Sequence, residues 1–186
     1  MNYIFGSSGF GKEVLWILRQ HGLTDIFFVE LSNEKQKVND IKVITQQDFK
    51  KLKGKKNCFL AVGSSSIREK MYKDIKEVLG VKFPNIVDPT VRQYEEYNSY
   101  GIGNIICAGA ILTTNIEVGN FNHFNLNTTV GHDTIVGDFC TFSPGSNISG
   151  CVHVGNKCFF GTNSVILENL KISNDIVIGA SAVVTK

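Results

Sequence analysis

The sequence predicts an α/β domain with a small parallel sheet, followed by an all-β domain of short parallel strands wound into a coil. Two observations support this division. Residues 1–90 alternate apolar strand patterns with amphipathic helix patterns, and residues 91–186 follow a six-residue period. Because a fixed internal period is the sequence signature of a repeat architecture, it outweighs any single motif as evidence for the fold.

The C-terminal half is a hexapeptide repeat. A large apolar residue stands at every sixth position, and a second row, four positions later, holds small or apolar residues with Asn122 as the exception. A period of six fits neither a helix nor a long strand, but it fits a short strand followed by a corner. The first row comprises Ile106, Leu112, Val118, Phe124, Val130, Val136, Phe142, Ile148, Val154, Phe160, Ile166, Ile172, Ile178 and Val184.

Three such strands close a triangular coil, so each first-row residue is expected to stack on the residue eighteen positions later. Val118, Val136 and Val154 form one such stack. Neighbouring coils then bury one another's apolar side. Glycines that follow the first row are expected to relieve the corners by adopting positive φ. They are Gly119, Gly131, Gly137, Gly155, Gly161 and Gly179.

The N-terminal half opens with a strand at residues 3–5, a glycine-rich loop and a helix, followed by a strand at residues 26–29. Such a loop suits phosphate, because free N–H groups and the helix dipole face an anion there. The motif G-x-x-G-x-G has Ser8 where the dinucleotide fingerprint has its second glycine, so a nucleotide-binding loop and a plain tight turn both stay open. The loop residues are Gly6, Ser7, Ser8, Gly9, Phe10 and Gly11, and Glu30 is placed to accept a hydrogen bond from a ribose hydroxyl.

The rest of this half continues the alternation. Thr45 is expected to cap a short helix. A strand at residues 58–62 then leads into a loop at Gly63. A helix at residues 67–79 and a last strand at residues 83–89 follow. The order predicts a Rossmann-like parallel sheet with helices on its faces. Both loops follow carboxyl ends of strands, where such sheets bind ligands, so Gly63 joins the predicted binding site.

Composition excludes several classes of function. The 186 residues carry a net charge of +2 without a charged tail, which gives no electrostatic support for nucleic-acid binding. Five cysteines without a C-x-x-C pair predict reduced thiols and a cytoplasmic location. There is no signal peptide pattern and no apolar run long enough to span a bilayer, so no membrane association is expected.

His132 is the candidate base, because it lies beside a corner glycine and before the carboxylate of Asp133. His123 and His153 occupy outward positions on different sides of the coil. A γ-class carbonic anhydrase would need three histidines on zinc, with spacings in multiples of eighteen. The spacings here are nine and twenty-one, so no metal is predicted.

The residues from Gly131 to Gly150 resemble a known family. Gly131-His132-Asp133, Ile135 to Phe139, Ser143-Pro144-Gly145 and Ile148-Ser149-Gly150 are similar to motifs of the bacterial sugar acyltransferases. This family includes UDP-4-amino-sugar and GDP-perosamine N-acetyltransferases and sialic acid O-acetyltransferases. The resemblance implies a left-handed parallel β-helix, a homotrimer, and acetyl-CoA in the groove between two subunits. It extends to the loops at residues 6–12 and 63–68 and the strand at residues 85–89.

The resemblance also implies roles for single residues. His132 resembles the family's general base, and Asp133 resembles the neighbouring acid that orients this base. The loop at residues 6–11 is similar to the loop that holds a nucleotide diphosphate in the family. Glu30 replaces a frequent Asp pair and Asp88 a frequent histidine. Many relatives continue past Lys186 with a tail, which leaves a C-terminal truncation open. Acetyl-CoA contacts are expected at Thr141, where some members carry a second histidine, and at Gly150, Gly161 and Ala180.

The function expected from these residues is acetyl-CoA-dependent N-acetylation of a nucleotide-linked 4-amino-4,6-dideoxy sugar. Two other hypotheses stay open: O-acetylation of a sialic acid or another sugar, and a non-catalytic solenoid that binds a nucleotide sugar. A free sialic acid would leave the phosphate loop without a diphosphate, which favours the nucleotide-linked amine. The nucleobase and the sugar are not determined by the sequence.

Overall fold

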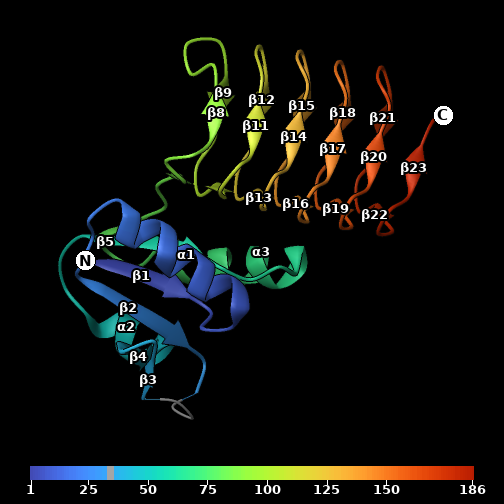
Figure 1. Ribbon diagram of the computed structural model, residues 1–186. Coiled ribbons are helices and arrows are strands. Elements are labelled where there is room, and N and C mark those ends of the chain that lie inside the picture. The colour runs from blue at the N-terminus through green and yellow to red at the C-terminus, as the bar shows by residue number, and fades with distance from the viewer. Residues whose placement is uncertain (33–35) are drawn as a thin grey trace. The chain divides into compact units, whose positions relative to one another are not determined.

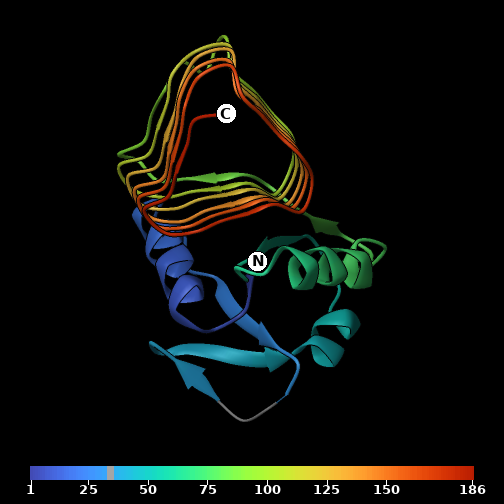
Figure 2. The same ribbon diagram turned by 90° about the vertical axis from the view of Figure 1, so that its right-hand side faces the viewer.

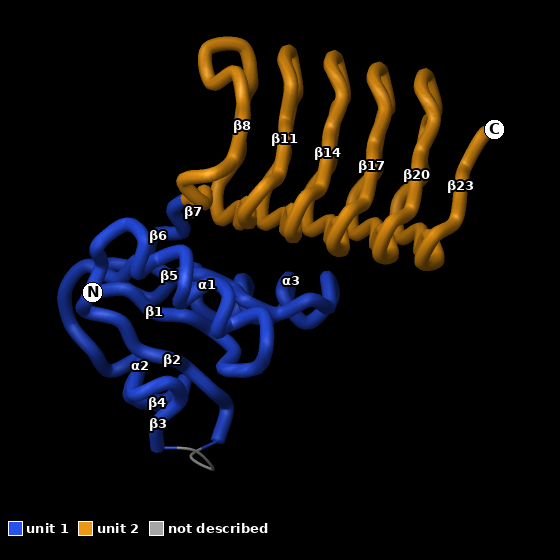
Figure 3. The backbone as a smooth tube through the Cα atoms, in the orientation of Figure 1, with its two compact units in different colours: residues 1–84 blue, residues 85–186 orange. Residues whose placement is uncertain are grey.

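The computed structural model describes residues 1–32 and 36–186, and the chain forms two compact units. Unit 1 comprises residues 1–84 and unit 2 residues 85–186 (Figure 3). The boundary lies six residues before the predicted one at residue 90. None of the described helices combines the length and the apolarity that a crossing of a bilayer requires.

Unit 1 is a six-stranded sheet with three helices, in the strand order β3-β4-β2-β1-β5-β6 (Figure 1). The predicted parallel sheet is confirmed for β4, β2, β1, β5 and β6. The antiparallel edge strand β3, which pairs with β4 and makes the sheet mixed, was not predicted. The elements are β1 (Asn2–Phe5), α1 (Gly9–Gln20), β2 (Ile26–Glu30), β3 (Lys37–Val38), β4 (Ile41–Thr45), α2 (Gln46–Lys51), β5 (Lys56–Leu60), α3 (Ser65–Ile75) and β6 (Val81–Lys82).

The core of unit 1 is built on β1, whose four residues are all buried. The ring of Phe49 on α2 packs edge-on against Tyr3 and Phe5, with centroids 4.9 and 5.0 Å apart. Thr45 caps α2 as predicted, because its hydroxyl accepts a hydrogen bond from the Asp48 N–H at 3.0 Å. The apolar residues of β1 and of α2 thus pack together in the core, as their sequence patterns predict.

Unit 2 is a coil of two-residue strands with a triangular cross-section (Figure 2). The first side contains β7 (Ile86–Val87), β10 (Ile105–Ile106), β13 (His123–Phe124), β16 (Thr141–Phe142), β19 (Phe159–Phe160) and β22 (Val177–Ile178). The second contains β8 (Arg92–Gln93), β11 (Ile111–Leu112), β14 (Thr129–Val130), β17 (Asn147–Ile148), β20 (Val165–Ile166) and β23 (Val183–Val184). The third contains β9 (Ser99–Tyr100), β12 (Glu117–Val118), β15 (Ile135–Val136), β18 (His153–Val154) and β21 (Lys171–Ile172).

The predicted stacking of the first row is confirmed. Val118 pairs with Val136, and Val136 with Val154, in parallel register. The rings of Phe124 and Phe142 stack at 4.7 Å, and those of Phe142 and Phe160 at 4.6 Å. Burial of this apolar column between coils is the main force that holds a solenoid together.

The first coil begins earlier than we predicted. Residues 83–89 were expected to add a strand to the N-terminal sheet, but Ile86 in β7 pairs with Ile105 in β10 of the coil. The six-residue period is hard to detect here for two reasons. Gln93 and Tyr100 occupy the first-row positions that hold aliphatic residues in the next coil, and they are seven residues apart instead of six. Their side chains are joined instead by a hydrogen bond of 2.7 Å between the Tyr100 hydroxyl and Gln93 Oε1.

The corner glycines do not adopt the positive φ that we predicted for them. Positive φ recurs two positions further on, at residues such as Asn115, Asn127 and Asp133. Asn and Asp tolerate this left-handed conformation better than other residues with a side chain. The glycine after the first row serves a close approach instead: a Cβ on Gly131 would lie 2.6 Å from the Gly150 nitrogen in the next coil.

Asn122, the exception in the second row, satisfies buried backbone groups. Its Oδ1 accepts a hydrogen bond from the Cys140 N–H at 2.7 Å, and its Nδ2 donates to the Gly137 carbonyl at 2.9 Å. Its own N–H donates to Oδ1 of Asn104, so the amides form a ladder along the axis. A buried amide with both ends bonded costs little, which explains its place in an apolar column.

Candidate functional site

Of the predicted glycine loop, Gly6, Ser7 and Ser8 connect β1 to α1, and Gly9, Phe10 and Gly11 form the first turn of α1. Gly6 has a φ of +101°, and a Cβ on Gly11 would collide with the Gly6 carbonyl oxygen. Ser8 is the N-cap residue of α1 and its side chain makes no capping hydrogen bond. The first turn of a helix has N–H groups without partners inside the helix, so the loop has the geometry of an anion site.

Glu30 is attached to this loop. Its Oε1 accepts a hydrogen bond from the Ser7 N–H at 2.6 Å. The carboxylate at the end of β2 therefore fixes the backbone of the turn. The expected bond from Glu30 to a ribose hydroxyl stays a prediction, because one carboxylate oxygen already has a partner in the chain.

The second predicted loop, at Gly63, lies beside the first. An added Cβ on Gly6 would lie 3.0 Å from the Ala61 carbonyl oxygen, just before Gly63. The buried guanidinium of Arg68 reaches back from α3 and donates to the carbonyls of Val62 at 2.7 Å and Gly63 at 3.2 Å. The structure thus brings the two loops together, as the parallel pairing of β1 with β5 predicts.

In unit 2, His132 and Asp133 lie at the corner that follows β14. The Nδ1 atom of His132 is 2.7 Å from Oδ2 of Asp133, and the two side chains are 60% and 52% exposed. The Asp133 carboxylate also accepts a hydrogen bond from Asn115 Nδ2 at 3.1 Å. Asn115 stands eighteen residues before Asp133, one coil away, and our sequence interpretation missed it although this spacing was available.

These contacts determine the charge of Asp133. The hydrogen bond from His132, and after it that from Asn115, lower the pKa of the Asp133 carboxyl below its ordinary value of 3.8. An ionised Asp133 accepts a hydrogen bond from Nδ1–H of the ring, which favours the tautomer with a lone pair on Nε2. The arrangement can therefore hold a neutral imidazole ready to accept a proton at Nε2.

The imidazole of His132 lies against Gly150. A Cβ on Gly150 would be 2.7 Å from Nε2 and 2.8 Å from Cε1 of the ring, so a side chain at this position would displace the imidazole. Within residues 1–32 and 36–186, no acceptor binds the N–H of Gly150. A backbone N–H beside a base is the arrangement that stabilises an oxyanion.

This open N–H differs from its counterparts at another corner. The N–H groups of Asn120, Asp138 and Asn156 each donate to an Asn or Asp side chain in the next coil, at 2.7 Å. A continuous side-chain ladder thus covers that corner. The corner with His132 and Gly150 carries no such ladder, and its donor is available to a ligand.

Comparisons with known proteins agree with both units. Residues 3–75 match the PglD N-terminal domain family. The GDP-perosamine N-acetyltransferase of Escherichia coli O157:H7 is 30% identical over 141 residues, which cover 70% of this chain and 61% of that relative. The match therefore spans less than two thirds of the relative's length.

Solved structures show the same architecture. One is PerB from Caulobacter crescentus in complex with CoA and GDP-perosamine, which has a TM-score of 0.92 and a sequence identity of 25% to this chain. The match covers 100% of this chain and 88% of the PerB chain. Another is the acetyltransferase domain of PglB from Neisseria gonorrhoeae FA1090 in complex with acetyl coenzyme A, with a TM-score of 0.90 and 24% identity. That match covers 99% of this chain and 90% of the PglB chain. The chain is thus similar to sugar acetyltransferases in sequence and in fold.

The similarity to the solved structures also supports the hand of the coil. The predicted fold class, a Rossmann-like unit followed by a left-handed parallel β-helix, is confirmed. The left hand came from the family resemblance, because a six-residue period by itself is the same for either hand.

The structure places Gly161 and Ala180 at one corner of the coil, Gly150 at another, and Thr141 on the first side. Thr141 is buried in β16, and Gly150 follows β17. Gly161 follows β19, and a Cβ there would lie 2.7 Å from the Gly179 carbonyl carbon, beside Ala180. Of the four, Gly150 lies against the His132 ring, and the role of all four in binding the cofactor stays a prediction.

The other histidines do not join His132. His123 lies in β13 on the first side of the coil and is buried, although its outward position predicted exposure. His153 is exposed in β18 on the third side. The two are thus on different sides from His132, which follows β14 on the second side, so one chain does not bring three histidines together.

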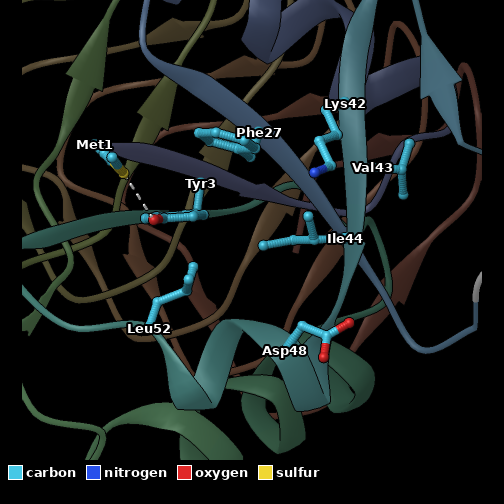
Figure 4. Close-up of a pocket in the computed structure, with 8 residues that line it drawn as sticks. All are labelled: Met1, Tyr3, Phe27, Lys42, Val43, Ile44, Asp48 and Leu52. Carbon is cyan, nitrogen blue, oxygen red and sulfur yellow. Dashed lines mark hydrogen bonds between the residues drawn. The ribbon is translucent and has the colours of Figure 1, made fainter.

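A pocket of about 440 Å³ in unit 1 was not indicated by any motif (Figure 4). Neither the glycine loop nor Glu30 lines it, so it is separate from the predicted phosphate site. Its lining residues are Met1, Tyr3, Phe27, Lys42, Val43, Ile44, Asp48 and Leu52.

Proposed function

We propose that the chain is an acetyl-CoA-dependent N-acetyltransferase that acts on the amino group of a nucleotide-linked 4-amino-4,6-dideoxy sugar. The observation that supports this most directly is the His132 ring, bonded to Asp133 at 2.7 Å and lying against Gly150. It combines a base with an available N–H donor, and acyl transfer from a thioester needs both. The similarity to GDP-perosamine N-acetyltransferase supports a nucleotide-linked amino sugar as the acceptor.

The reaction follows from the properties of these groups. The neutral amine attacks the thioester carbonyl carbon, and Nε2 of His132 takes the proton that the new C–N bond makes acidic. The N–H of Gly150 donates to the oxyanion of the tetrahedral intermediate. The ionised Asp133 stabilises the transient imidazolium. The intermediate then expels CoA as a thiolate, which takes the proton from Nε2 of the imidazolium and returns His132 to its neutral form.

The two units divide the work in this proposal. The loop at Gly6 to Gly11 and the neighbouring Gly63 loop hold the nucleotide diphosphate, since both follow carboxyl ends of adjacent strands. Glu30 fixes the first loop through the Ser7 N–H. Acetyl-CoA contacts Thr141, Gly150, Gly161 and Ala180, which lie on successive turns of the coil. A homotrimer, with the cofactor in the groove between subunits, would supply the walls that one copy lacks.

The test is the release of CoA thiol from acetyl-CoA with a panel of acceptors. UDP-, dTDP- and GDP-4-amino-4,6-dideoxyhexoses are compared with free sialic acids, and the product is identified by mass spectrometry. We expect turnover with a nucleotide-linked amine in the cytoplasmic pH range. Turnover of sialic acid alone would show an O-acetyltransferase, and binding of nucleotide sugars without thiol release would show a non-catalytic protein.

A further inference from the structure

Cys151 differs from the other four cysteines because it is partly exposed, whereas Cys58, Cys107, Cys140 and Cys158 are buried. It stands eighteen residues after Asp133 and therefore one coil below it. Its N–H donates to the His132 carbonyl at 2.8 Å, which holds the two corners together. The proposed acyl transfer does not use its thiol.

The side chains of His132, Asp133 and Cys151 converge at this corner. One ring nitrogen, one carboxylate oxygen and the sulfur all lie within 4.8 Å of one another. Ligands around a tetrahedral zinc ion, at bond lengths of about 2.0–2.3 Å, are separated by roughly 3.5 Å. The His132 and Asp133 side chains are 60% and 52% exposed, so a small rotation that exchanges their mutual hydrogen bond for bonds to the ion can bring the three atoms to this spacing.

From this geometry we infer that His132, Asp133 and Cys151 bind a thiophilic divalent cation of the Zn²⁺ type, and that the bound ion inhibits the transferase. Nitrogen, sulfur and oxygen ligands in a three-residue set suit Zn²⁺, with a fourth position open to water. Mg²⁺ and Ca²⁺, which prefer oxygen ligands, do not match the set. The site is not that of a resident cofactor, because no step of the proposed reaction needs a metal.

Inhibition follows from the dual use of the imidazole. A ring nitrogen that donates its lone pair to a cation breaks the arrangement in which Asp133 holds Nδ1 and Nε2 accepts a proton. The metal and the acetyl transfer therefore compete for His132. This second half of the inference depends on the proposed function, whereas metal binding itself does not.

Binding is tested with Co²⁺ as a spectroscopic substitute for Zn²⁺, because a thiolate ligand gives Co²⁺ a charge-transfer absorption in the near ultraviolet. We expect this absorption in the wild-type protein and its loss in Cys151→Ser. Cys151→Asn serves as a second variant, since Asn tolerates the φ of +58° at this residue. His153→Asn is the matched control, because His153 is an exposed histidine on another side of the coil.

Zn²⁺ affinity is then measured by competition with a fluorescent chelator. Loss of a group next to a ligand costs about 10- to 100-fold in affinity, so loss of the Cys151 thiolate is expected to cost at least about 100-fold. An unchanged affinity in both Cys151 variants, or no thiolate absorption in the wild type, would overturn the site.

The inhibition is measured on the acetyl-transfer reaction with and without Zn²⁺. Wild-type turnover should fall on addition of Zn²⁺ and return with a chelator, and Cys151→Ser should resist the same concentration. Zn²⁺ binding without loss of turnover would overturn the inhibitory role and leave the site in place. If the protein transfers no acetyl group at all, the proposed function fails, and the Co²⁺ spectrum still decides the site.

Discussion

The Nδ1 atom of His132 lies 2.7 Å from Oδ2 of Asp133, although both side chains are exposed and adjacent in sequence. The bond forms because Asp133 adopts the left-handed conformation of the corner, with a φ of +57°, and accepts a second bond from Asn115. The repeat geometry of the coil thus orients the candidate base. The predictions below follow from this corner, the glycine loop and the apolar column.

Replacement of His132 by alanine should lower kcat by about two to four orders of magnitude, the range for a positioned general base. KM for both substrates should change little, because the ring acts on the proton and not on binding. Thiol release under saturating acetyl-CoA measures the effect. His153→Ala is the control, and near wild-type turnover in His132→Ala would remove the residue from the mechanism.

The pKa of the Asp133 carboxyl should lie below 3.8 and rise when its partners are removed. The larger rise is expected in His132→Ala and the smaller in Asn115→Ala, since the His132 bond is the leading cause. A lowered folded-state pKa means that the contribution to stability is present above the unfolded pKa and is lost as pH falls through the folded one. NMR titration of the carboxyl carbon checks the order, which a larger shift in Asn115→Ala would reverse.

Substitution of Gly150 by alanine should displace the His132 ring, because the new Cβ would lie 2.7 Å from Nε2. A displacement of about 1 Å in an active site costs up to about 100-fold in rate, so kcat should fall while the circular dichroism spectrum stays that of the wild type. Gly179→Ala is the control, since an added Cβ there meets no atom within 4 Å. Equal activity of the two variants would contradict the expected role of Gly150.

Glu30→Ala should weaken binding of the nucleotide sugar by releasing the Ser7 N–H from its 2.6 Å bond. The loop then loses its fixed backbone, so KM for the nucleotide sugar should rise while KM for acetyl-CoA stays constant. Steady-state kinetics with each substrate varied in turn measures both constants. Glu77→Ala, on an exposed side chain, is the control, and an equal rise in both KM values would contradict a local effect.

Phe142→Ala should destabilise unit 2 by about 3–5 kcal/mol, the cost of removing a buried aromatic ring. Phe142 is stacked on both sides, at 4.7 and 4.6 Å, so its loss leaves a cavity in the middle of the column. Urea unfolding followed by circular dichroism measures the change. Phe159→Ala should cost far less, since that ring is 39% exposed, and similar losses in both variants would argue against the column as the source of stability.

Much of the candidate site could be predicted because a period of eighteen residues relates every corner to the next. The pairing of Val118 with Val136 and the place of His132 at a corner both follow from that period. Asn115 and Cys151 share the same spacing from Asp133, and the sequence interpretation overlooked them because they do not belong to the family motifs. The first coil was missed because Gln93 and Tyr100 interrupt the apolar row.

The sequence by itself determined the triangular coil, since a large apolar residue every sixth position can be buried only by stacking short strands. It also determined the glycine loop before α1, where strand, turn and helix patterns meet. Only the tertiary structure decided what the corners do: the glycines admit the next coil, and positive φ falls on Asn115, Asp133 and Cys151. Backbone approach between coils and the rotamers of exposed side chains depend on neighbours eighteen residues away, and a linear pattern does not specify them.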